Sequence, residues 1–569
     1  MAARSLTFVG LVVSSLLIVG QPTSTAADGC DVLPSEASLV VRLRAPDTTV
    51  SDLAAFLNKF QPGVGGIIQA QAGMLGMVIE NPTLAGVDKA ADWYLALFAK
   101  PTGAPDVVLL IPATDAAAMK AGITNASFKF GGDDKWGVYS RSEARVQLVE
   151  SCLAGDVAPI ATLFDRRDTE LFNSGHLTVF INGRTLKTVF ADKLGGAEDQ
   201  LDQLIDVIAS QVPAGKQSTD LTYVWDMYRE LGRGVIRAVR DSESLVVSIK
   251  ATEDSLQIDE LLSVSKGSNT DMTLSSQPSS DLAALKLLPE GQAMYAGVHL
   301  DAVPLVNFAK RMMSKMPVAD AVREKFLQSF EKMQDAKFGS FVGGGDMDIN
   351  AVDGVMSYFG VSEISPGAVI REAFASMEGG FEYEVGGLKQ KQSYQRDVEQ
   401  IDGLPVDLFT IKQTIPPELD PLGVQRAVNE KLYGSDGITQ RMVVRGNTLY
   451  QTMGGGTDAM KQLLHAKSWT DSQLLDARNH LPEKANFVCL IDIPSMTQRF
   501  AQLILSTGTL PVPLTADQLD GLRISRSYAG FSVTAEPQHL LVRSSLPVET
   551  FQGFVQIGMF IQQLQAGGN

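Results

Sequence analysis

A short unit repeats along this chain and restricts its possible folds more than any other feature. A Leu-Pro pair, a small polar turn and an apolar run occur in "LPSEASLVVRLRAP", "LPEGQAMYAGVHLD" and "LPEKANFVCLIDIP", which begin at Leu33, Leu288 and Leu481. A fourth copy, "HLTVFINGRTLKTVFADKL" from His176, lacks the Leu-Pro pair. Proline suits the first position of a strand, where no backbone donor is needed. Because a helical pattern follows each apolar run, the sequence predicts four strand–helix units.

Further elements recur in the same order after each pair of units. Two strands with a connection and a following helix are predicted over 92–121 and again over 337–374. A hairpin is predicted over 136–155, which matches 441–456. A closing hairpin of alternating apolar and polar residues is predicted near the end of each half.

The recurrence predicts two halves of the chain. They comprise residues 28–270 and 284–569, joined by a Ser/Thr-rich linker at 271–283. The second half has an extra segment near 379–438, which we interpret as additional antiparallel strands with a turn at Asp402-Gly403. Short strand connections interleaved with helices favour α+β over a doubly wound fold. We therefore predict a tandem duplication of mixed units, with largely antiparallel curved sheets covered by helices.

This layout resembles uncharacterised secreted bacterial proteins that repeat Leu-Pro-turn-strand-helix units. The resemblance covers most of the chain after the first 27 residues and depends on the short Leu-Pro motif. It implies no activity, and it transfers no catalytic residue to this sequence.

Residues 1–27 are predicted to be a cleavable signal peptide. A basic start with Arg4 precedes the uncharged apolar stretch 6–20, and the small residue Ala27 suits a cleavage site before Asp28. Cleavage predicts a secreted or periplasmic protein. The alternative is a lipoprotein signal at Cys30, but that cysteine lies well beyond the apolar run.

Charge and composition restrict the partners. The 569 residues carry a formal net charge of -17, which disfavours nucleic acid and anionic lipid surfaces. The segment 60–79 is uncharged, but its glycines, proline and glutamines favour a helical segment of a soluble domain over a membrane span. We expect no stable membrane span after signal cleavage.

The sequence predicts no catalytic residues and no cofactor. It contains no Gly-x-Ser-x-Gly elbow, and its five histidines lack zinc-protease spacing. We expect these histidines to lie at the surface or at interfaces. The glycines of "GGGTDAMKQLL", from Gly454, are predicted to start a helix capped by Thr457 or Asp458 instead of binding a phosphate.

A candidate calcium loop lies in "GGGDMDINAVDG", residues 343–354, where Asp346, Asp348 and Asn350 take ligand positions 1, 3 and 5. Position 6 is Ala351 instead of glycine, and position 12 is Ser357 instead of glutamate. We therefore expect a hairpin connection without a metal cage.

Methionine is concentrated in the second half of the chain, including Met312 and Met316 on one predicted helix. Flexible thioethers suit adaptable apolar surfaces, so these two residues are candidate ligand contacts. The alternative is ordinary core filling.

The three cysteines carry separate expectations. Cys489 lies at the strand position that matches Val41, so we expect it to be buried, reduced and inert. Cys30 precedes the first strand, and Cys152 is predicted to end a hairpin strand. If those strand ends meet, the two could form a disulfide. The alternative is an unpaired Cys30 on a mobile N-terminus.

Together these observations predict a non-enzymatic extracytoplasmic protein that binds or scaffolds. A curved sheet with covering helices could offer a cleft for an apolar or peptide-like ligand. The first alternative is an envelope structural or assembly factor that uses its surface, without a small-molecule pocket. A hydrolase with scattered acids is the remaining alternative. Architecture alone does not decide among them.

Overall fold

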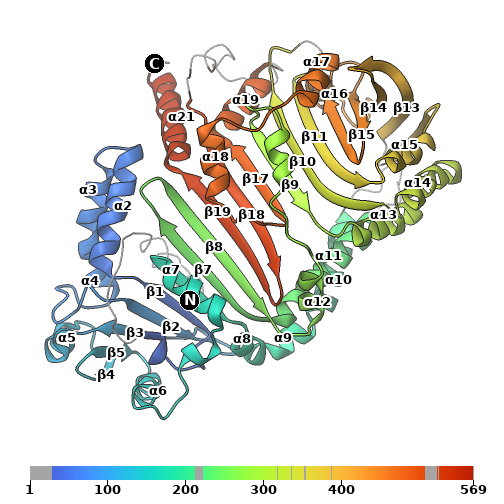
Figure 1. Ribbon diagram of the computed structural model, residues 1–569. Helices are drawn as coiled ribbons and strands as arrows, with labels where there is room; N and C mark the ends of the chain where they lie inside the picture. Colours follow the sequence, from blue (N-terminus) through green and yellow to red (C-terminus); the bar gives the residue numbers. More distant parts are fainter. Residues whose placement is uncertain are drawn as a thin grey trace. The chain divides into compact units, whose positions relative to one another are not determined.

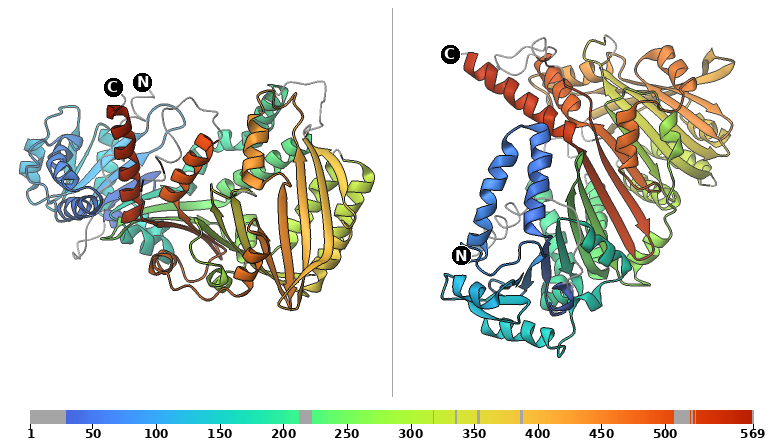
Figure 2. Two further views of the ribbon diagram at one scale, coloured as in Figure 1. Left: turned by 90° about the horizontal axis from the view of Figure 1, so that it is seen from above. Right: turned by 60° about the vertical axis from the view of Figure 1, so that its left-hand side comes forward.

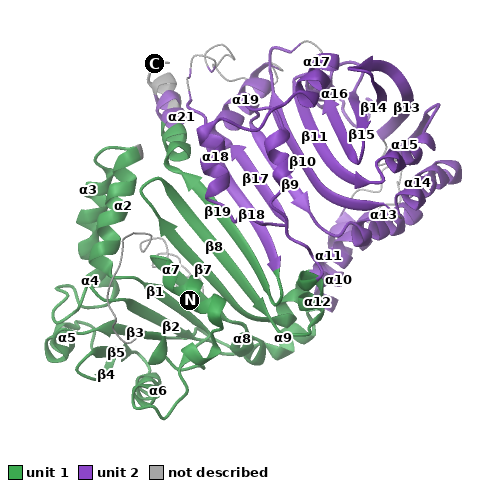
Figure 3. Ribbon diagram, in the orientation of Figure 1, with its two compact units in different colours: residues 1–197, 235–275, 536–555 green, residues 198–234, 276–535, 556–569 purple. Residues whose placement is uncertain are grey.

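The computed structural model describes residues 29–211, 222–316, 318–334, 336–351, 354–385, 388–506, 519, 522 and 524–567. These residues form two compact units (Figure 3). Unit 1 takes in residues 1–197, 235–275 and 536–555, and unit 2 takes in residues 198–234, 276–535 and 556–569. Each unit combines helices with an antiparallel sheet, which confirms the predicted α+β class. The predicted signal peptide lies outside the described residues.

The sheet of unit 1 is antiparallel at every pair of neighbouring strands. Its order is β4-β5-β3-β2-β1-β6-β7-β8-β19, so the strands of two repeat units, β1 and β6, are neighbours near its middle (Figure 1). The strands are β1 (Leu39–Leu43), β2 (Trp93–Phe98), β3 (Asp106–Pro112), β4 (Lys129–Gly132), β5 (Trp136–Ser140), β6 (Leu177–Asn182), β7 (Ser242–Ala251), β8 (Ser255–Val264) and β19 (His539–Pro547).

An apolar row crosses this sheet and forms the core of unit 1. Val40, Phe180, Val246 and Leu261 lie opposite one another on β1, β6, β7 and β8, and all four are buried. Phe172 of α7 packs on the row. Burial of one such side chain stabilises the fold by about 1.5–3 kcal/mol.

Figure 2 shows the neighbouring helices α2 and α3 of unit 1 side by side. The helices are α2 (Pro46–Phe60), α3 (Val64–Gln71), α4 (Leu75–Val78), α5 (Ala116–Gly122), α6 (Glu143–Leu153), α7 (Arg166–Ser174), α8 (Gly183–Val189), α9 (Ala191–Gly195) and α12 (Asn269–Ser275), with the 3₁₀ turns η1 (Gly29–Asp31), η2 (Ala72–Met74) and η3 (Ile160–Leu163).

The sheet of unit 2 is also antiparallel throughout. Its order is β18-β17-β9-β10-β11-β16-β15-β14-β13-β12, and the repeat strands β9 and β17 are again neighbours. The strands are β9 (Met294–His299), β10 (Lys337–Met347), β11 (Met356–Ser365), β12 (Phe381–Val385), β13 (Leu388–Ile401), β14 (Leu404–Thr414), β15 (Ile438–Arg445), β16 (Thr448–Met453), β17 (Phe487–Asp492) and β18 (Tyr528–Glu536).

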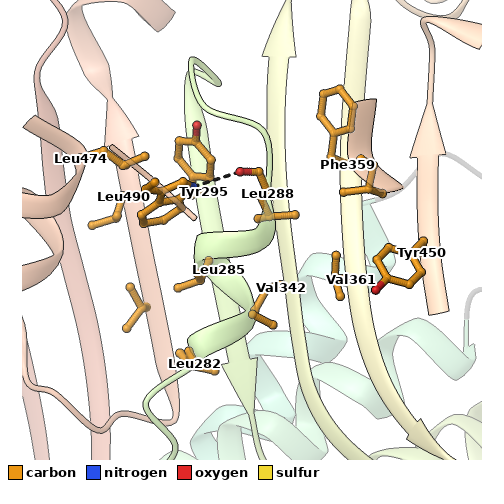
Figure 4. Close-up of a cluster of buried hydrophobic side chains, with 14 of the residues drawn as sticks. Leu282, Leu285, Leu288, Tyr295, Val342, Phe359, Val361, Tyr450, Leu474 and Leu490 are labelled. Atoms are coloured by element: carbon orange, nitrogen blue, oxygen red, sulfur yellow. Dashed lines mark hydrogen bonds between the residues drawn. The ribbon is translucent and has the colours of Figure 1, made fainter. Parts of the chain in front are cut away.

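The core of unit 2 surrounds Tyr295 (Figure 4). Leu490 lies opposite Tyr295 in the neighbouring strand, and the Trp469 indole N–H donates to the carbonyl of Leu288 at 3.0 Å. The Tyr295 hydroxyl donates to the carbonyl of Pro289 at 2.9 Å, so the buried phenol is hydrogen-bonded. The helices are α10 (Ala197–Gln211), α11 (Thr222–Asp241), α13 (Val303–Lys315), α14 (Asp320–Met333), α15 (Ala368–Ala375), α16 (Val424–Tyr433), α17 (Gly456–Leu464), α18 (Ser472–Asn479), α19 (Ile493–Ser506) and α21 (Val548–Gly567), with the 3₁₀ turn η4 (Ala283–Leu287).

The Leu-Pro motifs lie where the chain enters the sheets. The strands β1, β9 and β17 each begin six residues after the repeat leucine, at 39, 294 and 487. Leu33, Leu288 and Leu481 are all buried. Each polar turn is therefore preceded by a leucine whose side chain is buried in the core.

The two sheets share one strand order. Unit 1 contains the series β5-β3-β2-β1-β6-β7, and unit 2 contains β16-β11-β10-β9-β17-β18. Unit 2 continues beyond β16 with β15 and the strands β14, β13 and β12. The turn between β13 and β14 is Asp402-Gly403, and both residues have the positive φ that a type I′ turn requires.

The predicted hairpin over 136–155 is wrong in its second half. Residues 136–140 form β5, but residues 143–153 form helix α6. Val146, Val149 and Cys152 are the buried residues of this helix. Their spacing of three places them on one helical face, whereas a strand would bury every second residue.

Candidate interaction surface

Two of the candidate calcium ligands have partners within the protein. Asp346 lies near the end of β10 and forms an ion pair with Arg499 of α19. The Asp348 carboxylate accepts the backbone N–H of Asn350 at 3.0 Å and so closes a local turn between β10 and β11. No group of three His, Cys, Asp or Glu side chains that could hold a metal occurs within the described ranges.

The candidate methionines lie on or beside α13. Met312 is within the helix, Met316 is its C-cap residue, and both are half-buried. A shallow hollow of about 210 Å³ lies along the other part of this helix. Neither methionine lines it; its wall consists of Val303, Val306, Asn307, Met333, Gln334, Ala336 and Phe338.

The cysteines lie on different kinds of element. Cys30 is buried in η1, and Cys152 is buried in helix α6, where burial raises the pKa of its thiol. Cys489 is half-buried in β17, and burial likewise raises its thiol pKa, which disfavours the reactive thiolate. The disulfide between Cys30 and Cys152 stays a prediction.

The glycine run at 454–456 starts a helix, as its sequence predicts, but the predicted cap at Thr457 or Asp458 is wrong, because both residues lie inside the helix. All three glycines have positive φ, and Gly455 is the N-cap of α17. The Thr457 hydroxyl donates to Glu399 at 2.7 Å, and the same carboxylate accepts from Arg441 at 2.8 Å. The carboxylate of Glu399 therefore lies at the start of this helix, the place where a phosphate would otherwise bind.

Charged side chains of helix α11 form ion pairs with its neighbour α10. Arg229 donates to Asp206 at 2.5 Å and Arg233 donates to Asp202 at 2.6 Å, both on α10. The close approach of the helices involves Gly232, where an added Cβ would lie 2.6 Å from a methyl carbon of Leu201.

The same helix forms ion pairs with α13. Lys315 donates to Asp226 at 2.7 Å, and Arg311 donates to Glu230 at 3.0 Å. The hydrogen bond from Lys315, with help from Arg229, lowers the pKa of Asp226. The charged side of α11 is therefore in contact with two neighbouring helices.

Apolar side chains of the same helix pair face solvent. We call them the hairpin surface, and it consists of Leu204, Val207 and Ile208 on α10 with Tyr228 and Leu231 on α11. Each exposes between 44 and 57 % of its area. A soluble helix normally buries its apolar stripe and exposes its charges. This helix pair exposes apolar side chains as well as charged ones.

Helical periodicity separates the apolar residues of α11 from its acidic residues. At 100° per residue, Tyr228 lies about 160° from both Asp226 and Glu230, whereas Leu231 lies about 140° from Asp226 and about 100° from Glu230. On α10, Leu204 and Ile208 flank Leu201, which contacts Gly232 of α11. Both helices of the pair therefore carry exposed apolar side chains. Contiguous exposed apolar patches mark binding sites in soluble proteins.

Two further observations bear on this surface. No helix of the described ranges is both long and apolar enough to cross a membrane, and the segment 60–79 contains the short helices α3 and α4. Comparisons with protein-family models, with curated proteins and with solved structures found no match.

The hairpin surface was missed by sequence reasoning. Leu201, Leu204, Ile205 and Ile208 follow helical spacing and predict an amphipathic helix. That pattern does not reveal which side faces the protein, because a stripe is normally assigned to the core.

Proposed function

We propose that this protein is a non-enzymatic binding or scaffold protein that acts outside the cytoplasm, in the periplasm or after secretion. The hairpin surface carries the proposal, because exposed apolar side chains on two adjacent helices are suited to contact with a partner. The predicted signal peptide supports the location.

A duplicated scaffold is part of the proposal. The shared strand order supports it, and so do matching hydrogen bonds. The Arg44 N–H donates to the His176 carbonyl at 2.9 Å, and the His299 N–H donates to the Asn486 carbonyl at 2.8 Å. Arg44 and His299 each lie eleven residues after a repeat leucine. Independent folds would not be expected to reproduce such offsets.

The occupant that we propose for the hairpin surface is an amphipathic helix of a partner protein. Two adjacent helices offer ridges and a groove that accept a third helix, and anchors at three- and four-residue spacing match that mode. The chain is acidic, with a net charge of -17, which opposes binding to an anionic lipid surface.

The alternatives differ in what they require. An envelope assembly factor without a small-molecule pocket uses the same surface, so it differs in the partner's role and not in the contact. A pocket protein for an apolar ligand requires a cavity larger than the shallow hollow beside α13. A hydrolase requires converging catalytic groups.

Site-specific crosslinking tests the proposal. A photoreactive residue replaces Leu231 in the full chain, and a matched control replaces Leu422, which is 87 % exposed and lies outside the hairpin surface. We expect crosslinks from position 231 to a helical segment of another protein, identified by mass spectrometry, and none from position 422. Leu204→Gln with Ile208→Gln should abolish them with little change in stability.

Other crosslinking products overturn the proposed occupant. Crosslinks to this same chain indicate self-association, and crosslinks to lipid indicate a membrane-surface site. Equal products from both positions, or none from position 231 in intact cells, contradict a partner at the hairpin surface.

A further inference from the structure

The two faces of the sheet of unit 2 differ in exposure. Tyr295, Leu490 and Val342 project into the core of the unit, and none of them exposes more than 3 % of its area. Successive side chains of a strand alternate between faces, so their neighbours lie on the opposite face. There Met294 is 37 % and Phe531 is 38 % exposed. A solvated face of an antiparallel sheet normally carries polar side chains, whereas this exposed face is apolar.

Small residues form one row across this exposed face. Cys489 of β17 pairs with Ala296 of β9, and Ala296 pairs with Gly343 of β10. Paired residues of neighbouring strands project on the same face of a sheet. Phe531 of β18 pairs with Cys489 and ends the row. From Phe531 to Gly343 the row crosses three strand spacings, or about 14 Å.

Larger apolar side chains flank this row on both sides. Phe487 pairs with Val298, and Val298 pairs with Phe341, two residues along the strands from the small ones. On the other side of the row Ile491 pairs with Met294. Two residues of a strand span about 7 Å. The small residues therefore form the floor of an open groove that is about one side chain wide.

Tyr358 of β11 lies at the end of the groove opposite Phe531. A Cβ added to Gly343 would lie 2.5 Å from its ring, and one added to Gly360 would lie 2.7 Å from its hydroxyl oxygen. The ring therefore covers both glycines. Its hydroxyl is accessible to solvent and makes no hydrogen bond with another described residue. Burial of the ring raises the pKa of this phenol, so the hydroxyl keeps its proton and can donate.

The groove restricts the chemistry of its occupant. Its side chains carry no charge, so an ionic group would lose its hydration there without gaining a partner. A partner strand cannot add to β17, β9 or β10, because each of them already pairs on both edges. An α-helix with its side chains is about 10–12 Å in diameter, which is wider than the groove. A single alkyl chain is narrow and uncharged, and it meets all three conditions.

We propose that this groove binds the acyl chain of a neutral lipid, whose ester or hydroxyl oxygen accepts a hydrogen bond from Tyr358. Binding removes Met294 and Phe531 from water, which is the favourable contribution to such an association. The inference deepens the proposed binding function and rests on it. The groove shares no residue with the hairpin surface, so the crosslinking test above and the test below can fail independently.

The thiol of Cys489 reports whether the groove is occupied. It lies in the floor and is half-buried, whereas Cys30 and Cys152 are only 1 % and 4 % exposed. The folded full chain is treated with a thiol reagent in the presence of monolauroylglycerol, kept below the concentration at which it forms micelles. Mass spectrometry identifies the modified cysteines. We expect saturating lipid to slow the modification of Cys489 about tenfold or more, and glycerol alone to have no effect.

Calorimetry with variants separates the groove from general apolar attraction. Ala296→Leu makes the face more apolar but fills the floor, and it should weaken the binding of monolauroylglycerol about tenfold or more. Tyr358→Phe removes only the hydroxyl and should weaken binding about threefold to tenfold. Leu422→Asp is the control and should leave the affinity unchanged, because Leu422 is 87 % exposed and lies outside this face.

Circular dichroism verifies that each variant is folded. Phe531→Asp, at an exposed position, should weaken binding as much as Ala296→Leu and replaces it if that variant does not fold. Unprotected Cys489, an affinity that Ala296→Leu leaves unchanged or raises, or equal weakening by Leu422→Asp overturns the proposal. Tighter binding of sodium laurate than of monolauroylglycerol overturns the assignment of a neutral lipid.

Discussion

Asn182 of unit 1 and Asp492 of unit 2 occupy matching places at the ends of β6 and β17, but the hydrogen bonds around them differ. Each ends the second repeat strand of its sheet, and each is 1 % exposed. The Asn182 N–H donates to the Ser38 carbonyl at 2.9 Å, and the Asp492 N–H donates to the Ala293 carbonyl at 2.8 Å. Both side chains also accept a backbone N–H of the following helix.

The two residues differ in what they donate. The Asn182 amide donates to the carbonyls of Ser35 and Ala37, both at 3.0 Å. Asp492 cannot donate when ionised, and in unit 2 the Tyr528 hydroxyl donates to the Gln292 carbonyl at 2.8 Å. Gln292 and Ala37 hold the same place after the repeat leucine. The carbonyl at this place therefore accepts a side-chain hydrogen bond in both units. The donor is Asn182 of β6 in unit 1 and Tyr528 of β18 in unit 2.

The largest loss of stability is expected when Asn182 of unit 1 is replaced by the aspartate that unit 2 has at this place. Asn182→Asp places a buried carboxylate against the two carbonyl oxygens that the amide serves, and should lower the free energy of unfolding by about 4 kcal/mol. Urea denaturation followed by circular dichroism measures it. Asp492→Asn is the matched control and should cost about 1 kcal/mol or less, because burial already raises the Asp492 pKa and disfavours its charge. Equal losses would contradict the comparison.

A second contrast concerns charge in the first repeat strand. Arg42 donates to Asp92 and to the carbonyl of Phe172 at 3.0 Å, whereas Gly297 holds the matching place in unit 2. Arg42→Met should therefore cost about 3 kcal/mol, since it leaves Asp92 and buried carbonyls without their donor. Arg166→Met removes an exposed ion pair to Glu170 and should leave the stability nearly unchanged. Thermal unfolding distinguishes the two.

The third prediction compares His176 with Asn486, which does not titrate. Burial, with the charges of Arg44, Lys250 and Arg42, lowers the His176 pKa to about 4. The unfolded chain has the higher pKa of about 6.5 and binds the proton first, so stability is lost as the pH falls between these values.

The expected loss from His176 is about 2 kcal/mol at about pH 5 relative to neutral pH. His176→Asn should remove this part of the pH dependence, measured as the difference between the two proteins in urea titrations at each pH. Identical pH profiles for wild type and variant would show that the ring is accessible to protons in the folded state.

The smallest effect is expected at Cys489, which holds the place of Val41. Cys489→Val keeps the size of a half-buried side chain and should change stability by less than about 1 kcal/mol. The variant also tests the predicted pair of Cys30 and Cys152. Unreduced, denatured variant protein should label at no thiol if the pair forms, and at two thiols if it does not.

The sequence by itself determined the repeat strands, because their signals are local. The apolar run after each Leu-Pro turn became β1, β9 and β17, although each strand begins five residues after the proline and not at it. The Asp402-Gly403 turn was also predictable from the sequence, since its backbone conformation follows from the residue types. The antiparallel α+β class followed from the order and short connections of such elements.

Only the tertiary structure decided how these elements face one another. Helix α6 was predicted as a strand because its short apolar pattern fits both periods until packing selects one. His176, expected at a surface or interface, is buried because β6 lies inside the sheet. The hairpin surface is exposed although its apolar residues follow helical spacing, and Glu230 of α11 pairs with Arg311, 81 residues away. Such contacts depend on which distant residues meet, and a local pattern does not contain that information.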